Sequence, residues 1–256
     1  MIYIYGLVAA PPETVTQQVE GMMGLQAPVA VTAIGTWSLV HSDHDAEPIL
    51  PRRRLMLAHT RVLERLLPLP ALLPARFGLV TDTALSAQEL ILPQEARLAA
   101  ACEKVAGAAE FGVRVEFDRT QALGETLARL PDLRRTRDRL ARRGPDAHYE
   151  MVAFGERLGA ALDQRRLAAQ KALLAPLRAA SRDHVLRAPE SDVQVLKAEF
   201  LVASNQQADF AKLVADSAAQ LDFAADATAE IQIIGPAPAY HFVHLNLSSP
   251  QEEEAA

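Results

Sequence analysis

Hydrophobic residues recur along the chain with two different spacings, and the spacing predicts where strands and helices lie. Alternating or short apolar runs predict extended segments at residues 2–9, 29–35, 36–40, 72–78 and 111–118. Apolar positions three or four residues apart predict helices after Pro12, between Pro51 and Pro68, and over residues 86–109, where Ser86 and Glu89 form a capping-box pattern. Pro93 either splits this last stretch in two or starts a second helix at its first turn. The first 118 residues therefore follow the order strand, helix, strand, strand, helix, strand, helix, strand.

The pattern changes at residue 119. Residues 120–180 are rich in helix formers and are interrupted at Gly144 and Pro145, which predicts two long helices in a hairpin with a turn near residues 143–146. A strand block at 193–202, a helix after Ser204 and a strand at 229–235 follow, and residues 248–256 form a polar, acidic tail. We therefore expect an α+β protein with two domains, residues 1–118 and residues 119–256.

Composition favours a folded protein of the cytosol. Half of the 256 residues are hydrophobic, only 5% are aromatic, and a single cysteine excludes an intramolecular disulfide framework and a cysteine-based zinc site. Cys102 lies in an Ala-rich predicted helix, where a small buried thiol is the ordinary interpretation. The N-terminus has no basic region typical of a signal peptide, and three prolines interrupt the most apolar stretch, residues 66–75, so no membrane span is expected.

The net charge of −6 hides an uneven distribution. Residues 119–183 carry 14 basic and 8 acidic residues, whereas residues 184–256 carry 3 and 11. We expect the arginines of the middle segment to face acidic segments or solvent; the alternative is a surface for an acidic partner or a phosphate backbone. Aromatic residues for base stacking are absent from the arginine-rich stretch, and nucleic acid is not expected as a partner.

Candidate chemistry is sparse. Neither a nucleophile elbow nor a phosphate-binding glycine loop occurs, so no catalytic or cofactor-binding residue and no small-molecule substrate are assigned. His41, Asp43, His44 and Asp45 form the one local cluster of metal-capable groups, for which a solvated loop is the alternative, and no metal is assigned. The run Arg52 to Arg54 fits the exposed first turn of a helix better than an anion clamp.

Several motifs, in order over nearly the full chain, resemble the gas vesicle protein family GvpF/GvpL. They are Tyr3-Ile4-Tyr5-Gly6, His59 followed by Val62-Leu63-Glu64, Leu73-Pro74-Ala75-Arg76-Phe77-Gly78, the alternating strand after Phe111, the turn from Gly144 to Tyr149, Ala198-Glu199-Phe200-Leu201-Val202, and Gly235-Pro236 with Tyr240 and Phe242. The segment Leu73 to Gly78 is the most specific of these. One departure is that the family usually has a Trp and further prolines after Gly-Pro, where this chain has Ala-Pro-Ala-Tyr-His-Phe.

The resemblance implies two α+β domains, an N-terminal modified ferredoxin-like domain and a C-terminal domain built on the long helical hairpin. It also implies a non-enzymatic accessory protein of gas vesicles, located at the vesicle and in the cytoplasm, that binds the small hydrophobic shell protein GvpA and prevents its aggregation during nucleation and assembly. Other gas vesicle accessory proteins are further expected partners, and no cofactor is implied.

Two alternatives stay open at this point: a minor structural component of the shell, and a metal-dependent hydrolase that uses His41 and His44. The sequence does not say which face binds the partner. Arg76, Phe77, Tyr240 and Phe242, which belong to the family motifs, are the candidate partner-binding residues, although Arg76 and Phe77 equally fit a structural turn.

Overall fold

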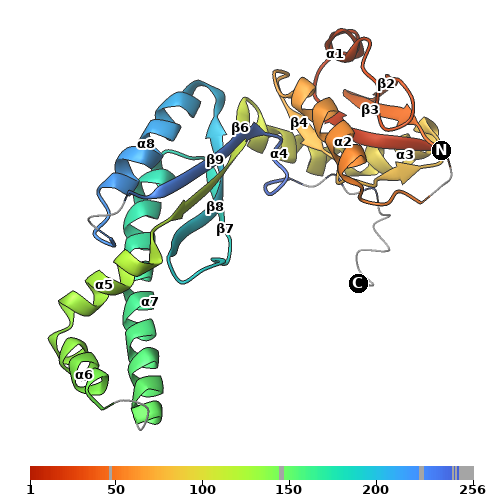
Figure 1. Cartoon of the computed structure of the whole chain (residues 1–256). Helices are drawn as coiled ribbons and strands as arrows, with labels where there is room; N and C mark the ends of the chain where they lie inside the picture. The colour runs from red at the N-terminus through yellow and green to blue at the C-terminus, as the bar shows by residue number, and fades with distance from the viewer. Residues whose placement is uncertain (46–47, 144–146, 225–227, 244, 246, 248–256) are drawn as a thin grey trace. The chain divides into compact units, whose positions relative to one another are not determined.

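The computed structural model describes residues 1–45, 48–143, 147–224, 228–243, 245 and 247 (Figure 1). The elements in chain order are β1 (Ile2–Val8), α1 (Pro12–Val19), β2 (Val29–Ile34), β3 (Trp37–Asp43), α2 (Arg53–Leu66), β4 (Leu72–Pro74), β5 (Val80–Thr81), α3 (Ala84–Ile91), η1 (Leu92–Gln94), α4 (Glu95–Val105), β6 (Ala108–Glu116), α5 (Arg119–Arg129), α6 (Pro131–Ala141), α7 (His148–Ala179), β7 (Asp183–Leu186), β8 (Gln194–Ala203), η3 (Ser204–Gln206), α8 (Gln207–Ala219) and β9 (Glu230–Ala237). Helices and two separate sheets confirm the predicted α+β class.

The chain forms two compact units, one of residues 1–110 with the segment that begins at Gly235, and one of residues 111–234. This division differs from the expected one at residue 118, because the segment after Gly235 packs back on the first unit. There the His241 ring and backbone N–H bind the Glu110 carboxylate at 2.7 and 2.8 Å, and Leu245 forms a β-bridge with Ala75. The acidic tail, residues 248–256, lies outside the described residues.

The first unit is built on an antiparallel sheet with the strand order β2-β3-β1-β4, and β5 also pairs with β1. With α1 between β1 and β2 and α2 between β3 and β4, this order is the split β-α-β motif that ferredoxin-like domains use. Every residue of β1 is buried, which agrees with its nearly continuous apolar sequence.

Helices α1 and α2 pack on the sheet through one shared core that includes Tyr3, Tyr5, Val15 and Leu63. Helix α3 packs against β2 and β5, and α4 against β4; Figure 1 shows α2 in front of the sheet and α3 behind it. The predicted capping residue, Ser86, is wrong by three residues, because Thr83 caps the helix. Because Thr83 is extended and its hydroxyl accepts a hydrogen bond from the Ser86 N–H at 3.1 Å, α3 begins at Ala84.

The second unit contains the sheet β7-β8-β6-β9, with α7 and α8 packed against β8. Its core includes packed aromatic rings: the ring centroids of Phe200 and Phe210 lie 5.3 Å apart, and those of Phe117 and Phe223 lie 5.5 Å apart. Strand β7, which pairs with β8, was not predicted, because its sequence Asp-His-Val-Leu is too short to show a period.

The first arm of the predicted helical hairpin is two helices, α5 and α6, and only the second arm is one continuous helix, α7. The break falls at Pro131, which occupies the first position of α6 because its missing N–H cannot continue α5. Of the predicted turn near residues 143–146, residues 144–146 lie outside the described residues. Although α7 has 32 residues, none of the described helices combines the length and apolar character that crossing a bilayer requires.

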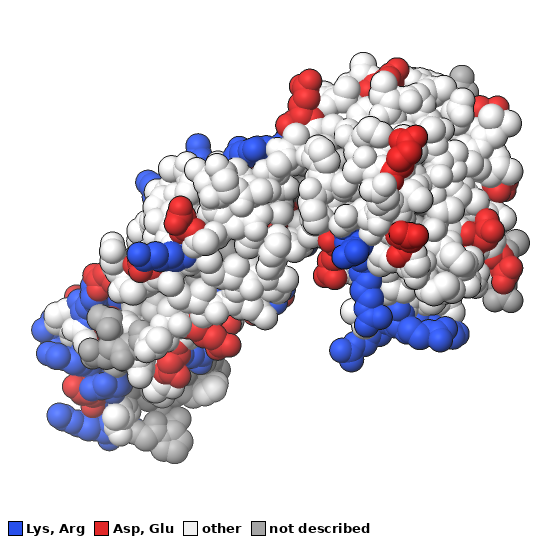
Figure 2. All heavy atoms as spheres, turned by 90° about the horizontal axis from the view of Figure 1, so that it is seen from above, with Lys and Arg blue, Asp and Glu red and all other residues white. Residues whose placement is uncertain are grey.

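Several arginines of the basic middle segment form ion pairs with acidic residues close to them in sequence. Figure 2 shows basic and acidic side chains mixed over the end of the second unit that carries α5 and α6. Two ion pairs, Arg119 with Asp192 and Arg129 with Asp222, join this segment to the acidic part of the chain, as the charge distribution predicts. Exposed pairs of this kind add little stability.

We expect the contact of α7 with the second sheet to depend on Leu173, which is fully buried. Leu173→Ala should lower the free energy of unfolding by about 2–5 kcal/mol, because it removes buried methyl groups and leaves a cavity. Leu167→Ala on the same helix, whose side chain is 48% exposed, should change it by less than about 0.5 kcal/mol. Urea denaturation followed by circular dichroism measures both; equal losses would contradict this packing.

Candidate functional site

A hollow of about 300 Å³ opens on the first unit where α2, the loop after β4 and the segment after β9 meet. Its walls are formed by Met56, His59, Thr60, Arg76, Phe77 and Tyr240. Three of the four candidate residues predicted from the sequence therefore lie around one cavity, although more than 160 positions separate Phe77 from Tyr240.

The side chain of Tyr3, which is fully buried in β1, fixes two walls of this hollow. Its hydroxyl accepts a hydrogen bond from the Gly78 N–H at 3.2 Å and lies 2.8 Å from Nδ1 of His59. Gly78 has a φ of +94°, a conformation in which a side chain would be strained, so a glycine here lets the loop turn toward Tyr3. The Phe77 ring then packs edge-on against Tyr3 and His59, with centroid distances of 6.2 and 5.8 Å.

The buried imidazole of His59 is held by the contact of its Nδ1 atom with the Tyr3 hydroxyl, in which either group can be the donor. The Nε2 atom, on the other side of the ring, is also buried. Burial lowers the pKa of His59 to about 4, an effect that the nearby Ala75 carbonyl partly offsets. At neutral pH, His59 is therefore uncharged.

The rim of the hollow combines an aromatic hydroxyl and a cation. Tyr240 is hydrogen-bonded to Thr60, and its burial raises the pKa of its phenol to about 12, so the hydroxyl keeps its proton. Arg76 is exposed. Apolar walls with a few polar groups suit an apolar side chain whose neighbouring backbone or polar group accepts a hydrogen bond.

Phe242, the fourth candidate residue, does not line this hollow. Only 8% of it is exposed, and the Lys104 ammonium lies 5.7 Å from its ring centroid. Together with the His241–Glu110 pair, this contact attaches the segment after β9 to α4 and β6. Phe242 thus helps to place Tyr240 at the hollow.

The cluster at residues 41–45 does not assemble into a ligand set. The Nε2 atom of His41 lies 2.8 Å from the Thr32 hydroxyl, and burial lowers the pKa of His41 against the opposing effect of Asp43. Successive residues of a strand point to opposite faces, so neighbours in sequence separate in space. Within the described part of the chain, His41, Asp43, His44 and Asp45 do not bring ligand atoms together.

Cys102 is buried in α4, as the Ala-rich pattern predicts. Burial raises the pKa of its thiol to about 12. At neutral pH the sulfur is therefore protonated and is a poor nucleophile.

Sequence reasoning missed Met56 and Thr60, which line the hollow from α2 beside His59. Residues three or four apart lie on one face of a helix, and a residue next in sequence lies close by. Met56 and Thr60 could therefore have been predicted from their positions relative to the motif residue His59 on the predicted helix.

Comparison with known proteins explains why these motifs occur together. Residues 1–244 match the family model described as gas vesicle synthesis protein GvpL/GvpF. The chain belongs to the GvpL/GvpF family. Among GvpL/GvpF relatives, it is 28% identical to gas vesicle protein F of Streptomyces sp. (strain CB03234), a match that covers 94% of this chain and 98% of the relative. It is 26% identical to gas vesicle protein F of Dolichospermum flosaquae, over 83% and 86% of the two chains.

Two crystal structures share the fold. The gas vesicle protein GvpF from Anabaena sp. PCC7120 matches with a TM-score of 0.79 and 23% identity, over 96% of this chain and 98% of that one. GvpF from Microcystis aeruginosa matches with a TM-score of 0.72 and 24% identity, over 95% and 99%.

Residues from the GvpL/GvpF motifs of the first unit contact one another in the structure. Tyr3 of the first motif binds His59 of the second and Gly78 of the third. Gly6 allows β1 and β4 to approach closely, since a Cβ at this position would lie 2.6 Å from the Leu73 oxygen. The motifs are thus separate parts of one packed cluster beside the hollow.

We expect acid to destabilise the fold through His59. Its pKa of about 4 in the folded chain lies below its usual 6.5, so between these values the unfolded chain binds a proton that the folded chain does not. The free energy of unfolding should be fully retained above pH 6.5 and should fall toward pH 4, by about 3 kcal/mol from this residue.

Chemical denaturation over a pH series from about 7 to 4 measures this effect. His59→Gln should remove this part of the pH dependence, and the exposed control His148→Gln should retain it. If wild type and His59→Gln lose the same stability in acid, His59 is not the titrating group.

Proposed function

We propose that this protein is a gas vesicle assembly factor that binds the hydrophobic shell protein GvpA and keeps it from aggregating while vesicles nucleate and grow. In this proposal it is not an enzyme, needs no cofactor and acts in the cytoplasm and at the vesicle, together with other gas vesicle accessory proteins.

The observation that carries the proposal is the composition of the hollow built by the family motifs. Met56, Phe77, Tyr240 and Arg76 are of the residue types that are enriched in protein–protein interfaces. Apolar surface is exposed beside the hollow, since Leu57, which follows the lining residue Met56, is 45% exposed. Exposed apolar side chains beside an apolar cavity are typical of a partner-binding surface.

The dimensions favour a protein partner. A volume of about 300 Å³ lies at the lower end of the range for small-molecule sites, which is about 300–1,000 Å³, and is enough for an anchoring side chain. A shell that excludes water needs subunits with extensive apolar surface, and such subunits associate indiscriminately unless that surface is covered. An apolar hollow of this size can cover one apolar segment of such a subunit.

Co-expression with GvpA tests this proposal. The wild-type protein should co-purify with GvpA and reduce the light scattering of aggregated GvpA. Met56→Glu should lower the amount of co-purified GvpA by about tenfold, because it puts a charge at the apolar rim. The matched control is Leu85→Glu, which changes a residue that is 64% exposed on α3 of the same unit and should retain binding.

Absence of a complex, or equal loss in the two variants, would contradict the proposal. Urea-washed vesicles distinguish the alternative role: a transient assembly factor should be absent from them, whereas a minor shell component should stay. Metal analysis of the purified protein, with His41→Ala and His44→Ala tested for vesicle formation, addresses the hydrolase alternative.

A further inference from the structure

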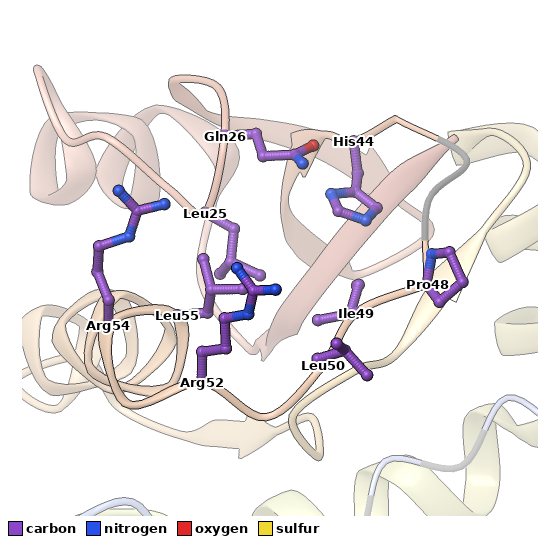
Figure 3. A pocket seen from close by; sticks show the side chains of 9 residues that line it. All are labelled: Leu25, Gln26, His44, Pro48, Ile49, Leu50, Arg52, Arg54 and Leu55. Carbon is purple, nitrogen blue, oxygen red and sulfur yellow. The ribbon is translucent and has the colours of Figure 1, made fainter.

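A second hollow, of about 240 Å³, lies at the start of α2 in the first unit. Figure 3 shows the residues that line it: Leu25, Gln26, His44, Pro48, Ile49, Leu50, Arg52, Arg54 and Leu55. Two features noted separately in the sequence, the histidine-rich segment and the arginine run, therefore border the same cavity.

One side of this hollow is basic. Figure 3 shows the side chains of Arg52 and Arg54 rising from the start of α2 toward the side where Gln26 and His44 lie. Neither arginine forms an ion pair with a described carboxylate, and the described residues that line the hollow include no acidic one. Arginines in a first helical turn also oppose the helix dipole, so their position is electrostatically unfavourable without an anion.

The opposite side offers a further hydrogen-bond donor. The Gln26 amide oxygen accepts a hydrogen bond from the Asp45 N–H at 3.0 Å, which fixes the amide orientation and leaves its NH2 group available as a donor. Guanidinium and amide donors on two sides of one cavity match the acceptor oxygens of a carboxylate.

The loop that carries Gln26 is held in place by a hydrogen bond to Tyr5 of β1. The hydroxyl of Tyr5, which is fully buried, accepts a hydrogen bond from the Leu25 N–H at 2.8 Å and lies 3.0 Å from the Ser42 hydroxyl. A Cβ at Gly24 would lie 2.1 Å from the Tyr5 oxygen, so only glycine permits this approach. Because the loop is fixed before any ligand arrives, less ordering is needed when one binds.

The remaining walls are apolar and the cavity is small. Leu25, Ile49, Leu50 and Leu55 contribute the apolar part. The volume of about 240 Å³ is below the range of about 300–1,000 Å³ that is typical of small-molecule and cofactor sites. These dimensions suit a single side chain and its neighbour better than a nucleotide.

We propose that this hollow anchors an acidic side chain, Asp or Glu, that lies next to an apolar residue in a segment of a partner protein. The carboxylate binds the guanidinium groups of Arg52 and Arg54 and the Gln26 amide, and the apolar neighbour packs on Leu25 and Leu55. The proposal does not require the shell protein to be this partner, and it uses none of the residues of the first hollow.

Titration of the isotopically labelled full chain with a capped peptide, acetyl-Ala-Leu-Glu-Leu-Ala-amide, tests the proposal by NMR. The same peptide with Gln in place of Glu should bind at least about tenfold more weakly, because it lacks the charge that the arginines recognise. The double variant Arg52→Gln/Arg54→Gln should lose binding to a similar extent. Arg53→Gln is the matched control, since Arg53 is exposed in the same turn but does not line the hollow.

Unchanged thermal unfolding of the three proteins would show that the variants fold. Selective loss with the double variant supports the proposal. Equal binding of the Glu and Gln peptides, equal loss with Arg53→Gln, or no peptide binding overturns it. If inorganic phosphate binds through the same arginines while the peptide does not, the hollow is a phosphate site and the acidic-segment proposal fails.

Discussion

Burial of two tyrosine hydroxyls in the central strand is the constraint on which the first unit depends. Tyr3 and Tyr5 lie on the same face of β1, fully buried, with ring centroids 5.0 Å apart. A buried hydroxyl without a partner is costly, so the surrounding chain must supply hydrogen-bonding groups. Helix α2 supplies His59, β3 supplies Ser42, and two loops supply the backbone N–H groups of Leu25 and Gly78.

Because their hydroxyls need partners, the two buried tyrosines connect the core of the first unit to both surface hollows. Tyr3 positions the His59 and Phe77 walls of the first hollow, and Tyr5 positions the Leu25 loop of the second. A tyrosine of β1 is thus hydrogen-bonded directly to the residues that form or hold a wall of each hollow. The physical cause is that each tyrosine has an apolar ring, which fills the core, and a polar end, which selects the segment that approaches it.

Local sequence was sufficient for most of the elements of the first unit, because segments such as β1 and α2 carry strong hydrophobic patterns. It was insufficient where a single residue overrides the pattern: Pro131 divides a stretch that otherwise has continuous helical character, and Thr83 rather than Ser86 caps α3. The return of the segment after Gly235 to the first unit depends on long-range contacts such as His241 with Glu110, which no local period encodes.

Local sequence was also insufficient to predict how the residues of the candidate site come together. Motif resemblance provided Arg76, Phe77 and Tyr240, but their convergence depends on the sheet topology and on the returning segment. Resemblance also provided Phe242, whose packing against Lys104 is a supporting contact outside the hollow. The second hollow escaped notice because its arginines and histidine lie in separate segments, each of which has an ordinary local explanation.

The return of the last described segment to the first unit has a consequence for synthesis. Because the chain is made from its N-terminus, the first 110 residues leave the ribosome well before Tyr240, with the whole second unit emerging between them. The sheet around β1 can form early, whereas the hollow of α2 and Phe77 stays without its Tyr240 wall until the second unit has also been made. The complete hollow can therefore form only in a chain in which both units have been synthesised.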